Sequence, residues 1–162
     1  MRFYIVAALL LVSTTLFAQT EGAIEMLRHD IKTEKVAIMT ASLPLTEKEG
    51  EAFWPMYREY SNEIAKLGDR RLAILKKVSE TSGAIDEKTA EKGVKESFSI
   101  ANDRNKILKK YYDKAAKIMG VVKAARFLQI ENQMLTILDA QIADQVPLLK
   151  AAAPKPEKQE KQ

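Results

Sequence analysis

The side chains that could carry out catalysis are few in this sequence. Catalysis requires a nucleophile, a base and a group that stabilises developing charge, all in one pocket. The chain has one histidine and no cysteine. His29 lies away from the apolar stripe of Ile24, Leu27 and Ile31, so we expect it to be solvated. No Gly-rich phosphate loop, HExxH or GxSxG motif occurs. We therefore expect no catalytic residue, no cofactor and no enzyme activity.

Metal-ligating side chains are equally sparse. A good transition-metal site uses two or more histidine or cysteine ligands. This chain offers only His29, carboxylates and scattered methionines that mostly fall where a helical core would use them, at Met26, Met39, Met56, Met119 and Met134. We expect no specific metal site.

The remaining residues that could form a site are charged residues on otherwise apolar helix faces. At about 100° per residue, Glu131 lies in the middle of one such stripe and Arg104 in the middle of another. Arg71 interrupts a third, between Ile64 and Leu75. The stripe around Glu131 consists of Phe127, Met134, Leu135, Leu138 and Ile142.

Arg104 and Glu131 flank Gly120 at similar distances along the chain, sixteen residues before it and eleven after it. In two antiparallel helices joined at Gly120, their axial offset is within the reach of an arginine side chain. The spacing predicts an Arg104–Glu131 ion pair inside the protein. Two interpretations follow: an architectural pair that fixes helix register, or part of a ligand cleft or catalytic dyad. The architectural one is favoured because arginine holds a carboxylate ionised.

Two surface features suggest a partner-binding surface. Five lysines follow one face of the third predicted helix: Lys106, Lys109, Lys110, Lys114 and Lys117. Such a stripe is typical of a solvated face, and it would also attract acidic partners. Trp54 projects to one side of the apolar face formed by Phe53, Tyr57 and Tyr60. It is either a contact point for a partner chain or a residue covered by the first helix.

The elements that must position these residues are helices. Apolar residues recur at helical spacing over about 22–40, 47–78, 87–118 and 122–145, and in the first of these ranges they are Ile24, Leu27, Ile31 and Ile38. Thr46 and Glu49 form a capping box ahead of the second helix, Asp86 is a plausible N-cap for the third, and Gly120 ends it. The short link at Gly120 predicts an antiparallel hairpin. The fold class expected is all-α: a four-helix, long-hairpin bundle.

The two ends of the chain differ from this central part. Residues 1–18 have a basic start, an apolar run and a final small residue, which is typical of a secretory signal peptide. Residues 19–147 then form a single helical domain. Residues 148–162 are rich in Lys, Glu, Gln, Ala and Pro and are predicted to be a disordered tail.

The signal peptide implies export to the periplasm, with no stable membrane insertion after cleavage. The net charge of the chain is +4, spread along its length. An exported protein meets no genome, so nucleic acid is not an expected partner.

The order of these elements resembles the Spy/CpxP family of periplasmic helical proteins, known for its LTxxQ motif. Leu45-Thr46-Glu47-Lys48-Glu49 stands where that motif opens the long second helix, with Glu49 in place of glutamine. The family's second motif opens the last helix. There, the stretch from Ile118 to Phe127 keeps the flanking isoleucine and phenylalanine.

The resemblance implies a cradle-shaped homodimer and a chaperone or stress-signalling role. The metal-sensing branch of that group relies on histidines that this chain lacks. We therefore expect an ATP-independent periplasmic chaperone or envelope-stress protein that binds non-native or partner polypeptides. The alternative is a regulatory module that docks on an inner-membrane sensor or sigma-factor regulator.

Overall fold

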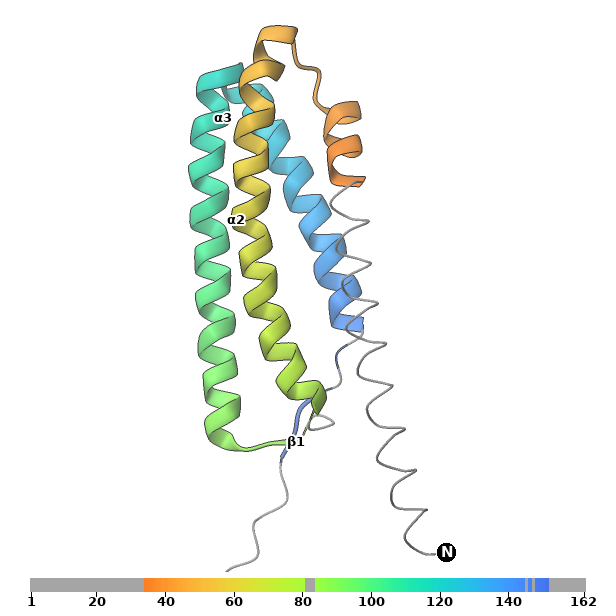
Figure 1. The fold of residues 1–162 in the computed structure, drawn as a ribbon, viewed down its shortest axis with the longest axis vertical. Coiled ribbons are helices and arrows are strands. Elements are labelled where there is room, and N and C mark those ends of the chain that lie inside the picture. Colours follow the sequence, from red (N-terminus) through yellow and green to blue (C-terminus); the bar gives the residue numbers. More distant parts are fainter. Residues whose placement is uncertain (1–33, 81–83, 145, 147, 152–162) are drawn as a thin grey trace, which may run out of the picture.

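The computed structural model describes residues 34–80, 84–144, 146 and 148–151, and two long helices account for most of them (Figure 1). α2 spans Glu47–Glu80 and α3 spans Glu87–Asp144. Ahead of α2, residues 34–42 are helical, with residue 34 the first that the structure describes. With Leu43, they are called the arm (residues 34–43).

The start of α2 follows from the capping residues predicted there. The backbone N–H of Thr46 donates to the Glu49 carboxylate at 2.7 Å, and the N–H of Glu49 donates to the Thr46 hydroxyl at 3.3 Å. Each side chain thus satisfies a backbone donor that the first helical turn leaves free. Lys123 Nζ also contacts Glu49 at 2.6 Å, which ties this cap to α3. Pro55 lies inside α2, which continues through it.

α3 contains a sharp reversal at Gly120. This residue has φ 81° and ψ 162°, far from helical values. That region of backbone space is nearly exclusive to glycine, because a Cβ atom would clash there. The chain folds back at this point, so residues 87–119 (α3N) and 121–144 (α3C) run antiparallel (Figure 1). Asp86 caps α3N, since its carboxylate accepts the N–H of Thr89 at 2.8 Å.

A two-residue parallel strand pair lies at the opposite end of the protein from the reversal in α3 (Figure 1). β1 (Ala84–Ile85) pairs with β2 (Lys150–Ala151), with Ala84 opposite Lys150. No strand was expected, and β2 falls within the segment predicted as a disordered tail. Two residues are too few to show the alternation by which strands are recognised in a sequence.

The core of the described residues is aromatic in its centre. Phe53, Tyr57 and Tyr60 of α2 pack with Tyr111 of α3N and Phe127 of α3C, and each has 2 % or less of its surface exposed. The ring centroids of Tyr60 and Tyr111 are 5.4 Å apart, and those of Tyr60 and Phe127 are 5.7 Å apart. Edge-on contacts of this kind add to the free energy of apolar burial.

The arm contributes Met39 and Leu43 to this core, with 0 % and 2 % exposed. The apolar stripe predicted for the first helix included Ile38, which is 42 % exposed. That prediction was wrong by about one residue of helical rotation, because Met39 rather than Ile38 faces the core.

The all-α class is confirmed for the described residues. Three predictions lie partly or wholly outside them: the signal peptide at 1–18, the first helix before residue 34, and the tail beyond residue 151. Among the helices that the structure describes, none combines the length and the hydropathy needed to cross a membrane.

Candidate functional site

The only fully buried charged side chain among the described residues is Glu131 of α3C, at 0 % exposed. Its carboxylate accepts three hydrogen bonds. The Tyr57 hydroxyl donates at 2.8 Å and the Tyr60 hydroxyl at 2.7 Å. Lys35 Nζ of the arm donates at 2.8 Å and lies 5.7 Å from the centre of the Tyr60 ring. We call Glu131, Tyr57 and Tyr60 the carboxylate pocket.

The electrostatics of this pocket favour a static role. Burial, followed by the nearby Glu131 charge, raises the pKa of Tyr57 and of Tyr60 far above the ordinary value of 10. Both hydroxyls therefore stay protonated and can only donate to the carboxylate. Because Glu131 has no exposed surface, a substrate would have no access to it. The pocket links the arm, α2 and α3C.

The predicted Arg104–Glu131 ion pair is not formed. Arg104 instead contacts Asp139 at 2.7 Å, and Arg71 contacts the other oxygen of the same carboxylate. Asp139 lies nineteen residues after Gly120 and Arg104 sixteen before it. At about 1.5 Å per residue, their axial offset is about 4.5 Å, compared with about 7.5 Å for Glu131. The nearer acidic residue takes the arginine, and Asp139 also supplies the partner that the sequence left open for Arg71.

Lys35 is the functional residue that sequence reasoning missed. It lies four residues before the buried Met39, so it falls on the helix face that points inward. A cation on an apolar stripe is the same signal that singled out Arg104 and Glu131. It was overlooked because the stripe was drawn through Ile38.

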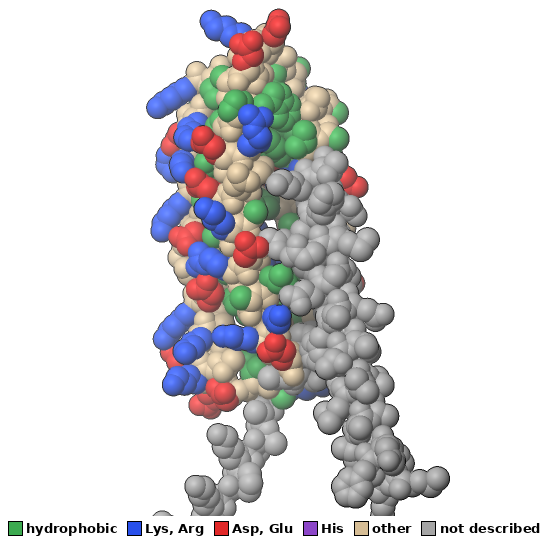
Figure 2. Space-filling view, viewed as in Figure 1, with side chains coloured by type: hydrophobic (Ala, Val, Ile, Leu, Met, Phe, Trp, Pro, Cys, Tyr) green, Lys and Arg blue, Asp and Glu red, His purple; other side chains and the backbone are tan. Residues whose placement is uncertain are grey.

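The lysine stripe is on the surface, as predicted, but most of its charges are paired. Lys110 contacts Glu63 of α2 at 2.7 Å and Lys114 contacts Glu59 of α2 at 3.0 Å. Within α3N, Lys109 contacts Asp113 at 2.7 Å and Lys106 contacts Asp103 at 3.4 Å. Lys117 is exposed. Figure 2 shows the resulting alternation of basic and acidic side chains along this edge of the protein.

Trp54 does not join the lysines in one surface. Its side chain is half-buried, edge-on to Phe53 with the ring centroids 5.2 Å apart, and packed against the core. Glu63, which holds Lys110, is nine residues further along α2. At about 100° per residue, that places it on the opposite side of the helix from Trp54. The two parts of the predicted binding surface therefore face different directions.

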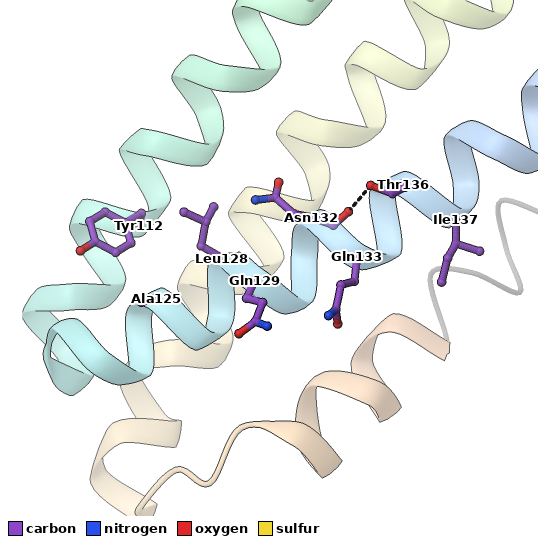
Figure 3. Close-up of a pocket in the computed structure, with 8 residues that line it drawn as sticks. All are labelled: Tyr112, Ala125, Leu128, Gln129, Asn132, Gln133, Thr136 and Ile137. Atoms are coloured by element: carbon purple, nitrogen blue, oxygen red, sulfur yellow. Dashed lines mark hydrogen bonds between the residues drawn. The ribbon is translucent and has the colours of Figure 1, made fainter.

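A shallow groove between α3N and α3C has a different character (Figure 3). Tyr112 lines it from α3N and seven residues line it from α3C. None of the eight is charged. We call it the α3 groove: Tyr112, Ala125, Leu128, Gln129, Asn132, Gln133, Thr136 and Ile137. Tyr112 and Leu128 are half-buried and the others are exposed, Ile137 to 60 %.

The neutrality of the groove has a sequence signature. Between Phe127 and Leu138 the single charged residue is Glu131, which is buried, although 30 % of the chain is charged. Phe98 of α3N is 69 % exposed and precedes Tyr112 by fourteen residues, which places it within about 40° of the same direction. The Phe98 side chain therefore points in a direction similar to that of Tyr112, about 21 Å further along α3N.

A second groove differs from the α3 groove because most of its lining is charged. It is lined by Glu63, Lys66, Leu67, Arg70, Asp103, Lys106, Ile107 and Lys110. Arg70 there contacts Asp103 and Glu96, each at 2.7 Å. Within residues 34–80 and 84–151, apart from the gaps at 145 and 147, no group of three or more His, Cys, Asp or Glu could hold a metal ion.

Comparison of the chain with protein-family models, curated proteins and solved structures finds no match.

Proposed function

We propose that this protein is an exported, non-enzymatic polypeptide-binding protein of the periplasm, of the ATP-independent chaperone or envelope-stress type. The observation that carries the proposal is the α3 groove. Uncharged side chains line it, Ile137 in the groove is largely exposed, and Phe98, further along α3N, is largely exposed as well. Exposed apolar side chains gathered on one face favour contact with other polypeptides.

The occupant proposed for the groove is an apolar or uncharged polar segment of a non-native polypeptide. A strongly charged segment would lose its hydration against a lining that offers no opposite charge. Gln129, Asn132 and Gln133 each provide hydrogen-bond donors and acceptors, so they suit exposed peptide groups of any sequence. The lysine stripe is a weaker candidate because four of its five members pair with acidic residues.

The finer prediction of a four-helix bundle that pairs into a Spy-like cradle homodimer belongs to the same proposal. Its support is the capping box at Thr46 and Glu49, the reversal at Gly120 and the antiparallel α3N and α3C. Export would be tested by cell fractionation and by sequencing the N-terminus of the purified protein. A mature protein that begins near Gln19 in the periplasmic fraction is expected.

The test of binding is aggregation of two unrelated denatured clients in the presence of residues 19–162, without nucleotide. Suppression of both at near-stoichiometric amounts is expected. Gln133→Lys places a charge in the groove and should weaken suppression. Asn62→Lys adds the same charge to the exposed surface of α2 and should not.

Two results would contradict this proposal. Equal activity of the two lysine variants would remove the groove from the explanation. No suppression of either client by the wild-type protein would exclude a general chaperone and favour the regulatory module that binds one dedicated partner.

A further inference from the structure

The carboxylate pocket is assembled without the arm. Glu131 comes from α3C and both tyrosines come from α2, and these helices are in direct contact. Tyr57 binds one carboxylate oxygen and Tyr60 the other. What the pocket lacks on its own is a cation, and Lys35 of the arm supplies it.

The arm carries a compact recognition pattern. Lys35, Met39 and Leu43 are spaced four residues apart, so they follow one side of a helical turn. The Lys35 side chain is 14 % exposed, and Met39 and Leu43 are buried. On the outward side, Val36 and Ile38 are 44 % and 42 % exposed. The arm therefore docks in the way that an amphipathic helix docks in a groove, through one cation and two apolar anchors.

The connection between the arm and α2 is short. Residues 43–46 are the only non-helical ones between the 34–42 helix and α2. Pro44 fixes its own φ angle and disfavours helical geometry at Leu43, so this connector prefers an extended path. Within one chain this connector seats the arm on its own pocket, and when a short hinge of this kind opens it favours exchange of the segment between copies.

We propose that the arm exchanges between two copies of this chain, so that Lys35 of each copy binds Glu131, Tyr57 and Tyr60 of the other. Every contact that the arm makes within one chain is regained in the exchanged dimer, because the pocket and the pattern are unchanged. The balance between the two forms then depends on the connector and on protein concentration. This inference does not depend on the proposed function, since it uses none of the α3 groove.

Charge reversal tests the exchange directly. Lys35→Glu places a carboxylate against Glu131, and Glu131→Lys places an ammonium against Lys35, so neither variant can seat its own arm. Mixed together, the two variants restore opposite charges only across the two chains. The double variant K35E/E131K restores them within one chain and is the matched control.

One of the two variants is expressed with uniform ¹⁵N labelling, so that native mass spectrometry separates the heterodimer from both homodimers by mass. The expected result is that the mixture forms heterodimers at least tenfold in excess of either homodimer. A statistical mixture of dimers would overturn the proposal, because it would mean that dimers form without the pocket. The absence of any dimer from the mixture, with the double variant folded, would overturn it as well.

A second measurement uses the wild-type protein and so does not rely on the folding of a variant. An equimolar mixture of isotopically labelled and unlabelled chains is refolded at high concentration. Isotope-filtered NMR then reports contacts between chains. Cross-peaks between the Lys35 side chain of one copy and the Tyr60 ring of the other are expected. Cross-peaks within one chain only would overturn the proposal.

Discussion

Replacing Lys35 with methionine removes one cation and keeps most of the apolar stem of the side chain. Glu131, with no exposed surface, would then have two tyrosine hydroxyls as donors and no charged partner at hydrogen-bond distance. Removal of one partner from a buried ion pair costs about 3–5 kcal/mol. Since a domain of this size is stable by about 5–15 kcal/mol, we expect a large fraction of the free energy of unfolding to be lost.

The matched control is Lys95→Met, the same substitution in an exposed pair. Lys95 contacts Glu91 at 2.5 Å within one helix, and the two side chains are 73 % and 63 % exposed. Pairs of this kind contribute no more than about 0.5 kcal/mol. The contrast between the two variants therefore isolates the effect of burial from the effect of losing a lysine.

Urea denaturation measures both variants. Circular dichroism follows the helices, and fluorescence of Trp54, the only tryptophan in the chain, follows the aromatic core beside the pocket. A loss for Lys35→Met as small as that for Lys95→Met would refute the reasoning. The slope m separates two responses. A lower m means that the arm has already left in the native state, because less surface then remains to be exposed.

Three further predictions follow from the hairpin, the shared aspartate and the helix cap. Gly120→Ala should cost about 1–3 kcal/mol from backbone strain alone, since a Cβ there meets no atom within 4 Å. Gly120→Asn should not rescue the loss, because asparagine favours ψ values far from 162°; thermal unfolding of both variants checks this. Asp139→Asn should cost about 1 kcal/mol in urea because two one-third-exposed arginines share that carboxylate, and a cost unchanged by 1 M salt would contradict the explanation. The hydrogen bond from Lys123 lowers the pKa of Glu49 below its ordinary 4.5, so the stability it contributes is present above that value and lost as pH falls through the lowered pKa. Glu49→Gln, which keeps the cap, should reduce the fall in the free energy of unfolding at acid pH, as measured by urea denaturation at a series of pH values. An unchanged fall would contradict the assignment of this effect to Glu49.

Local signals in the sequence predicted the elements well. The capping box at Thr46 and Glu49, the N-cap at Asp86 and the stop at Gly120 depend on neighbours within four residues, so no tertiary information was needed. The aromatic face of α2 was equally clear, because Phe53, Tyr57 and Tyr60 repeat at helical spacing. These features set where α2 and α3N begin and where α3N gives way to α3C.

Contacts between helices were harder to predict. A difference of about 3 Å along the axis decided whether Arg104 met Glu131 or Asp139, and the sequence prediction had considered Glu131 alone as the partner. Lys35 was missed because the predicted apolar face of the first helix was rotated by about one residue from the face that packs in the core. The neutral lining of the α3 groove, in contrast, was visible in the sequence from Phe127 to Leu138. It was missed because the sequence was searched for charged residues, and this stretch contains only one.

The strand pair at the base also bears on how far the hairpin can open. α3C is about 36 Å long, since its 24 residues rise about 1.5 Å each, and it is joined to α3N at Gly120. A rotation of α3C by about 10° about Gly120 would move the far end of α3C by about 6 Å. That exceeds the spacing of about 4.8 Å between paired strands. β2 begins six residues after α3C ends, so its pairing with β1 adds a restraint on such a movement to the packing of α3C in the core.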